Sequence, residues 1–208
     1  MLRAITTICF ALLSTLPISA ALLTSAPAGG STTTLAGGGS CFSGPSAGAV
    51  SGFSLTATND ACYNYSGGWG LDGNGNWGMS LIGDNSGSTI FTIDLGGLFG
   101  AVGGFLNYAP GYGTPVITAL AADGVTVLES YDLSVSAPIS TPSGFDQGAF
   151  RGISRPTAEI AYLQFGGSYT ALHDLTLAEG STVPEPATTF LVLAGSALAF
   201  LGRRRLRG

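Results

Sequence analysis

Apolar and polar positions divide the chain into three parts. An uncharged, mostly apolar run covers Ala4–Leu23 and a second one covers Ala187–Leu201, whereas the residues between them are rich in Gly, Ser, Thr and aromatic side chains. Short apolar runs in this middle part are broken by turn residues, and no period of 3.6 residues persists. The pattern therefore predicts β-strands in the middle of the chain and an apolar segment near each end.

Nine short strands are predicted, each a β-rich run flanked by turn residues. They lie at Val50–Thr58, Trp77–Ile82, Thr89–Leu95, Ala101–Tyr108, Val116–Ala122, Val125–Leu133, Ala149–Ile153, Ile160–Phe165 and Leu172–Ala178. Asp123-Gly124 stands between two such runs and favours a hairpin with a two-residue type I′ turn. Without an intervening helix, this spacing predicts an all-β fold, one antiparallel β-sandwich or barrel over residues 41–181. Residues 29–40 are expected to form a flexible lead-in.

Charged residues are few and biased in sign. The chain has seven arginines, no lysine and twelve acidic residues. The segment from Gly29 to Ser181 contains two arginines and eleven acidic residues, which gives a formal charge of −9. A domain with this charge repels phosphate backbones, so we expect no nucleic-acid partner. One histidine and three cysteines also argue against most histidine-based catalysis and against a cysteine-rich zinc module.

The N-terminus has the pattern of a secretory signal peptide. Arg3 gives a short positive start, the apolar run follows, and small residues lie around Ala20 and Ala28. We expect residues 1–28 to be a signal peptide that the Sec export machinery recognises and that is removed at a bond between Ala20 and Ala28. A retained N-terminal membrane anchor is the alternative, although no charged stop-transfer sequence follows the run.

The C-terminus predicts one short transmembrane helix, placed at residues 187–202. The seventeen residues between Glu185 and Arg203 carry no charge, and as a helix they would reach roughly 25 Å, slightly less than a ~30 Å hydrocarbon core. Insertion is therefore only marginally favourable. The basic tail at residues 203–208 keeps this end in the cytoplasm and everything before Pro184 outside. Its anchoring charges are Arg203, Arg204, Arg205 and Arg207.

Val183-Pro184-Glu185-Pro186 directly precedes this helix. The two prolines hold the backbone extended, so Glu185 is expected to be accessible just outside the membrane. Pro-Glu-Pro, a short apolar helix and an arginine-rich end resemble the PEP-CTERM sorting signal on surface proteins of Gram-negative bacteria, here over residues 182–208. An ordinary C-terminal membrane anchor is the alternative.

The resemblance implies a partner and a destination. Exosortase, a membrane-embedded enzyme similar to cysteine transpeptidases, would recognise the signal and the tail would be lost. The precursor would be anchored in the inner membrane, and the product would reach the cell surface or the extracellular polysaccharide matrix.

A second resemblance concerns the middle of the chain. Thr89–Gly96 (TIFTIDLG), then Val102–Leu106, then Asp123-Gly124 follow the order of motifs in galactose-binding-like jelly rolls. Ile160–Phe165 followed by His173–Leu177 is similar to the closing strands of sandwich domains common in PEP-CTERM proteins. Many antiparallel β-proteins contain such motifs, so the resemblance predicts a jelly-roll fold and leaves a sugar site open.

Three cysteines have different expected fates. Cys9 lies in the N-terminal apolar run and would leave with it, whereas Cys41 and Cys62 form an even pair in a chain destined for an oxidising space. A Cys41–Cys62 disulfide would close a loop of about 20 residues and contribute about 3 kcal/mol. A pair of free thiols is the alternative.

Aromatic residues in Gly-rich surroundings are the main ligand-binding candidates. Trp69, Trp77 and Tyr112 would stack on sugar rings if their faces are exposed, which suits a polysaccharide partner. The alternative is that the two tryptophans close the end of the sandwich core, with their indole N–H groups bonded to loop carbonyls.

One segment has partial metal-binding spacing. Asp72, Asn74 and Asn76 are spaced so that alternating oxygens could converge on Ca²⁺. However, Trp77 stands where the Ca²⁺ loop has glycine, and Gly83 where it has a bidentate glutamate. A Gly/Asn-rich turn explains the segment more simply, so we expect no cofactor and keep Ca²⁺ as the alternative.

No arrangement in the sequence predicts catalysis. His173-Asp174 lacks a Gly-x-Ser-x-Gly nucleophile elbow. Glycoside hydrolysis needs two carboxyl groups about 5–10 Å apart. Three acids are candidates for such a pair, but their spacing in sequence does not give the distance between their carboxyl groups: Glu129, Asp132 and Asp146. We therefore expect a non-enzymatic structural or interaction protein, with a carbohydrate-binding module, Ca²⁺-dependent or not, as the alternative.

Overall fold

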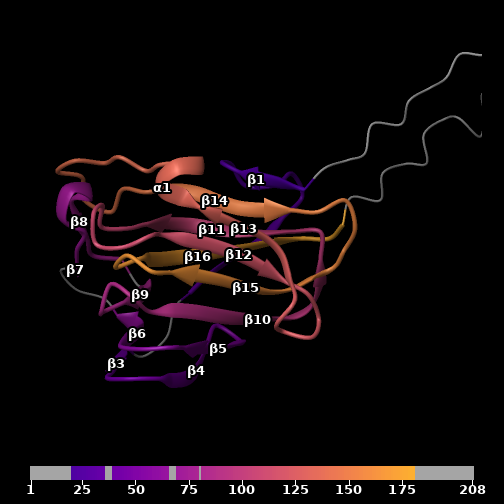
Figure 1. The fold of residues 1–208 in the computed structure, drawn as a ribbon, viewed down its shortest axis with the longest axis horizontal. Coiled ribbons are helices and arrows are strands. Elements are labelled where there is room, and N and C mark those ends of the chain that lie inside the picture. Colours follow the sequence, from indigo (N-terminus) through magenta and orange to yellow (C-terminus); the bar gives the residue numbers. More distant parts are fainter. Residues whose placement is uncertain (1–19, 36–38, 66–68, 80, 181–208) are drawn as a thin grey trace, which may run out of the picture.

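Two antiparallel sheets packed face to face form the core of the molecule, which confirms the predicted all-β sandwich. The computed structural model describes residues 20–35, 39–65, 69–79 and 81–180. Figure 1 shows the strands of both sheets running along the long axis of the molecule. The resemblance to galactose-binding-like jelly rolls stays a prediction.

The strands of each sheet come from distant parts of the sequence. The eight-stranded sheet has the order β1 (Ala21–Leu23), β14 (Ala149–Ser154), β11 (Ala101–Asn107), β16 (Ala171–Ala178), β9 (Leu81–Asp84), β6 (Ala61–Tyr65) and β3 (Ser40–Phe42), with β2 (Ser31–Thr34) also paired to β16. The six-stranded sheet has the order β13 (Val127–Asp132), β12 (Val116–Leu120), β15 (Ile160–Gly166), β10 (Ile90–Phe99), β5 (Phe53–Ala57) and β4 (Ser46–Val50).

The remaining elements are short. A two-stranded ribbon joins β7 (Trp69–Gly70) to β8 (Asn76–Trp77), and the 3₁₀ turn η1 (Asp72–Asn74) lies between them. The helix α1 (Leu133–Ser136) follows β13, with the Asp132 side chain accepting a hydrogen bond from the Ser134 amide at its start.

The main core lies between the two sheets. Phe91, Ile93 and Leu95 of β10 are buried, whereas the side chains between them are more exposed, as expected for a strand with one face on the core. Phe91 is paired with Phe165 of β15, and their rings stack at a centroid distance of 4.8 Å. Burying such a side chain contributes about 1.5–3 kcal/mol. Val102 of β11 joins the same cluster from the opposite sheet.

A second apolar cluster involves the β7–β8 ribbon. Cys62 belongs to it, whereas its neighbours Ala61 and Tyr63 belong to the main core, so this cluster lies on the other face of the eight-stranded sheet. Trp69 is 8% exposed and Trp77 is 0% exposed, with the Trp77 ring 5.6 Å from that of Phe105.

The hypothesis that Trp69 and Trp77 present exposed faces to a ligand is therefore wrong. The ribbon packs both rings into the second cluster instead. No described residue gives Trp77 Nε1 a hydrogen-bond partner, so the expected bond from this indole to a loop carbonyl is not found.

The N-terminal part of the domain contains more regular structure than the sequence indicates. Residues 29–40 were expected to be a flexible lead-in, but β2 pairs with β16 over Ser31–Thr34, and Leu35 is fully buried in the core. Residues 20–28 include β1, which pairs with β14. The Ser/Thr-rich sequence of β2 hides this strand, because its stability comes from pairing with β16 and not from an apolar pattern.

The predicted hairpin at Asp123-Gly124 is confirmed, but the predicted turn type is wrong. β12 and β13 pair with a register shift after Ala119, and only Gly124 of the dipeptide has a positive φ, 70°. The Asp123 carboxylate accepts hydrogen bonds from Val125 N and Thr126 N, which stabilises a wider turn. Hydrogen bonding, above all from the Thr126 hydroxyl, holds the pKa of Asp123 below its usual value.

A two-residue turn with positive φ at both positions occurs instead between β4 and β5. Ser51 and Gly52 have φ of 50° and 90°, and Val50 pairs directly with Phe53. This is the type I′ geometry. It divides the predicted strand Val50–Thr58: Val50 is the last residue of β4, and β5 covers only Phe53–Ala57.

Several predictions lie outside the described residues: the signal peptide up to residue 19, the sorting motif at residues 183–186, the helix at 187–202 and the basic tail. Within the described ranges, no helix is both long and apolar enough to cross a bilayer.

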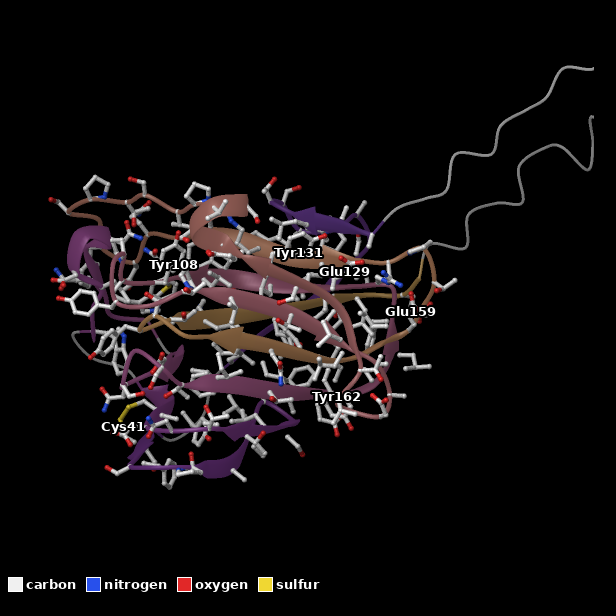
Figure 2. The ribbon with its side chains drawn as sticks, viewed as in Figure 1. Cys41, Tyr108, Glu129, Tyr131, Glu159 and Tyr162 are labelled. Atoms are coloured by element: carbon white, nitrogen blue, oxygen red, sulfur yellow. A yellow bond between two sulfur atoms is a disulfide. The ribbon has the colours of Figure 1, made fainter. Side chains whose placement is uncertain are left out.

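The predicted disulfide is confirmed. Cys41 and Cys62 are directly paired on β3 and β6, with their Cα atoms 4.0 Å apart, and the bond joins positions separated by 21 residues. It ties β3, at the edge of the eight-stranded sheet, to its neighbour. Figure 2 shows Cys41 on the lower left of the molecule.

Reduction of this disulfide should lower the free energy of unfolding by about 3 kcal/mol, because the unfolded chain regains the freedom of the closed loop. Urea unfolding with and without reductant measures the difference. The double variant Cys41→Ala/Cys62→Ala should resemble the reduced protein and be insensitive to reductant. Equal urea midpoints for the oxidised and reduced wild type would contradict this expectation.

Candidate functional site

A hollow of about 280 Å³ lies where three loops meet at the end of the sandwich that carries the β7–β8 ribbon. Its lining residues are Gly70, Asp72, Ala109, Tyr112 and Tyr169. They come from the ribbon, from the loop after β11 and from the turn between β15 and β16. Figure 1 shows β7 and β8 at the left end of the molecule.

Two tyrosines and one carboxylate give the hollow its chemistry. Tyr112 is 52% exposed, and its ring lies edge-on to that of Tyr169 at a centroid distance of 5.4 Å. Hydrogen bonding to the exposed Asp72 side chain, followed by the negative charge of Asp72, raises the pKa of Tyr112. The site therefore combines aromatic faces with a phenol that stays protonated beside an acid.

The backbone around the hollow is strained. Asp72 and Tyr169 both adopt left-handed φ angles, 48° and 46°, which non-glycine residues rarely do. Each such residue costs on the order of 1 kcal/mol or more, and such residues gather at binding and active sites. A Cβ at Gly113 would lie 2.1 Å from the carbonyl oxygen of Gly167, so only glycine allows these two loops to approach so closely.

A buried amide network supports the loops from below. Asn74 Nδ2 donates to Asn107 Oδ1 at 3.0 Å and contacts the carbonyl oxygens of Tyr108 and Ile139. Asn74 Oδ1 accepts from Thr141 N at 3.1 Å. Because Asn74 ends η1, this network fixes the turn that carries Asp72. Figure 2 shows Tyr108 at this end of the sandwich.

Two hydrogen bonds join the loop after β11 to the turn before β16. The Ser168 hydroxyl donates to the carbonyl oxygen of Ala109 at 2.6 Å, and Ala109 N donates to the carbonyl oxygen of Ser168 at 3.1 Å. These bonds lie next to Tyr169 and hold the two tyrosine-bearing segments together.

The structure does not bring the Ca²⁺ candidates Asp72, Asn74 and Asn76 together as a ligand set. Asp72 is exposed and lines the hollow beside Tyr112, whereas Asn74 is buried and its side-chain oxygen accepts a hydrogen bond from Thr141 N. The described ranges contain no group of three or more His, Cys, Asp or Glu side chains able to hold a metal ion. Asp72 and Asn74, at the two ends of η1, thus differ in both exposure and surroundings although they are only two residues apart in sequence.

The acids considered for glycoside hydrolysis have structural partners. Glu129 and Glu159 both bind Arg155, at 2.6 and 2.7 Å, and Figure 2 shows the two glutamates on the right of the molecule. Hydrogen bonding to Glu159 is the main cause of the raised pKa of Arg155. Asp132 caps α1, and Asp146 accepts hydrogen bonds from two backbone amides of the loop after β8.

His173 and Asp174 are neighbours on β16, with His173 Nε2 3.5 Å from Asp174 Oδ1. Ser168, the nearest serine in sequence before them, is fully buried and donates to the Ala109 carbonyl. Its hydroxyl is therefore committed to holding a loop.

A larger hollow of about 390 Å³ lies beside β2. It is lined by Phe99, Glu179 and otherwise aliphatic, Gly, Ser or Thr residues. It therefore lacks the paired aromatic rings of the hollow lined by Tyr112 and Tyr169, which we call the tyrosine hollow. We therefore regard the tyrosine hollow as the candidate binding site.

Tyr112, which the sequence suggested as a possible ligand aromatic, is exposed and lines the hollow, whereas Tyr169 and the position of Asp72 beside it were not predicted. Tyr169 follows Gly166-Gly167-Ser168, a turn-forming signal that could have marked it as a loop aromatic. Its proximity to Tyr112 depends on two strand pairings and was not available from the sequence.

Asn107→Ala should lower the free energy of unfolding by about 2–5 kcal/mol, because it leaves several buried groups without partners, each worth about 1–3 kcal/mol. Asn107 bonds Asn74, Thr141 and the carbonyl oxygen of Gln147. The exposed Asn85→Ala is the control and should change stability by less than about 0.5 kcal/mol. Chemical denaturation measures both; equal effects would show that the network is not a support.

Comparison with known proteins gives one match. No curated protein and no solved structure matches the chain. Residues 182–206 match the family model described as the PEP-CTERM protein-sorting motif. This confirms the resemblance seen in Pro184-Glu185-Pro186, the apolar stretch and the arginine-rich end. The chain carries a PEP-CTERM sorting motif at its C-terminal end.

Proposed function

We propose that this protein is a non-enzymatic structural or interaction component of the cell surface or extracellular matrix. The observation that carries the proposal is the sorting motif at residues 182–206, which implies exosortase as the processing partner, export, and a membrane-anchored precursor in a Gram-negative bacterium. The N-terminal apolar run serves as the signal peptide for the Sec machinery, and residues 187–202 form the transmembrane helix of the precursor.

The use of the polar side chains supports a non-enzymatic role. The acids that might have formed a catalytic pair are bound to Arg155 or to backbone amides, so each contributes to the scaffold. The disulfide and the small number of charges suit a domain that must endure outside the cell.

Carbohydrate binding is a second candidate function, favoured by the tyrosine hollow. Tyr112 and Tyr169 offer ring faces and edges to the apolar face of a sugar, and Asp72 can accept hydrogen bonds from sugar hydroxyls. Strained backbone at two of the lining residues is typical of a binding site.

Charge narrows the class of sugar. Residues 29–181 carry two arginines and eleven acids, and both arginines are engaged: Arg155 with two glutamates and Arg151 with backbone carbonyls. A polymer rich in uronic acids would be repelled by this surface. The hollow therefore suits a neutral polysaccharide.

Replacing Pro184-Glu185-Pro186 with three alanines should leave the C-terminal tail attached and the protein in the inner membrane. Mass spectrometry of the protein from its native host gives the C-terminus, and membrane fractionation gives its location. The exposed Pro110→Ala is the control and should be processed normally. An unchanged C-terminus in the triple variant would show that the motif does not direct processing.

Tyr112→Ala and Tyr169→Ala should each weaken binding to neutral polysaccharide about tenfold, because an aromatic contact worth about 1.5 kcal/mol is lost. Binding of the processed protein to glycan arrays, with and without chelator, measures this effect.

Tyr162→Ala is the matched control for these variants and should bind like the wild type. Tyr162 lies near the beginning of β15, whereas Tyr169 follows the end of this strand. Loss of binding in all three variants, or binding to uronic-acid polymers alone, would contradict the assignment of the hollow.

A further inference from the structure

The N-terminal apolar run changes its role at Ala21. In sequence the run is continuous from Ala4 to Leu23 and contains no charge. In the structure its last three residues form β1, whose register pairs Ala21 with Ser154, Leu22 with Ile153 and Leu23 with Gly152. Leu22 also packs against the main core. These three residues therefore belong to the folded domain.

β1 protects an edge of the domain. In the eight-stranded sheet it is the outer neighbour of β14, so without it β14 would expose a row of unpaired amide and carbonyl groups. The following residues are also ordered: Gly30 N donates to the Pro27 carbonyl, and β2 pairs with β16. A cut at Ala26 or Ala28 would remove β1 and leave this edge open.

Few peptide bonds both suit cleavage of a signal peptide and leave β1 intact in the mature chain. Cleavage occurs after small residues at the end of an apolar run, and Ala20 is the last small residue before the paired strand. The bond after Ala20 leaves every paired residue of β1 in the mature chain, whereas a bond one residue later removes Ala21 and its pairing with Ser154.

The first residue of β1 and the last residue of β16 lie at the same end of the sandwich. A row of paired residues crosses the sheet from Ala21 to Ser154, then to Ala101, then to Ala178. With neighbouring strands about 4.8 Å apart, three steps span roughly 15 Å. The beginning of β1 and the end of β16 accordingly lie at one end of the sandwich (Figure 1).

This arrangement suits a precursor held at both ends. The start of β1 at Ala21 and the end of β16, after which the chain leads to the sorting motif, lie at the same end of the sandwich. The sandwich can therefore fold completely on the outer side of the membrane before either end is cut, and neither cut has to open a strand.

We propose that signal peptidase cleaves the bond between Ala20 and Ala21, so that the mature chain begins with the first paired residue of β1. The inference rests on the proposed role of the N-terminal run as a signal peptide and narrows the interval between Ala20 and Ala28 to one bond.

N-terminal sequencing and intact-mass analysis of the protein from its native host test the assignment. The expected N-terminus is Ala21. A mature chain beginning at Leu22, Ser25, Pro27 or Gly29 would overturn the assigned bond while leaving export intact. Retention of Met1 in exported protein would instead contradict the signal-peptide role, so the two failures are distinguishable.

Two matched variants of the full-length chain sharpen the test. Ala20→Gln places a large polar residue before the bond and should raise the uncleaved fraction at least tenfold, whereas Ala28→Gln should be processed like the wild type. Immunoblots of membrane fractions measure the uncleaved precursor. Normal cleavage of Ala20→Gln at Ala21, or accumulation of uncleaved Ala28→Gln, would overturn the proposal.

Discussion

The apolar layer between the two sheets is the constraint on which the rest of the molecule depends. Phe91 and Phe165 stack within one sheet, and Val102 and Leu175 of the other sheet belong to the same core cluster. Few of these residues are close in sequence, so each central strand is fixed by partners that arrive from elsewhere in the chain. The loops at the ribbon end, including those with Tyr112 and Tyr169, are then brought together by strands that already have one register.

The sequence was most informative where strands are long and apolar. β10, β11, β12, β15 and β16 all lie close to their predicted positions, because each is a β-rich run of at least five residues that is flanked by turn residues. β1 was hidden inside the N-terminal apolar run, and β2 consists of Ser and Thr with no apolar residue. Both exist because a partner strand supplies their hydrogen bonds, and a single sequence carries no record of that pairing.

The candidate site was only partly predictable for a similar reason. Tyr112 lies in a stretch rich in Gly and Pro, which indicates a loop, and it is exposed. Trp69 and Trp77 lie in equally Gly-rich surroundings but are paired on the ribbon and buried. Local composition separates loop from strand. It does not show whether a loop aromatic folds inward, because that depends on the apolar surface it can reach.

Charged side chains in this domain act mainly on the backbone. Six aspartates accept hydrogen bonds from nearby or loop backbone amides: Asp60, Asp84, Asp94, Asp123, Asp132 and Asp146. Arg151, 7% exposed, donates to three carbonyl oxygens, and burial lowers its pKa. Most aspartates in the described part of the chain thus stabilise the backbone and do not form an ion pair with arginine.

The pairing of Cys41 with Cys62 has a consequence for the timing of folding. Thiols stay reduced in the cytosol, so β3 and β6 lack their covalent link until the chain has crossed the membrane. An exported chain that is weakly folded beforehand can cross the membrane more easily. The two cysteines thus leave the chain without a covalent cross-link before export and link β3 to β6 after it.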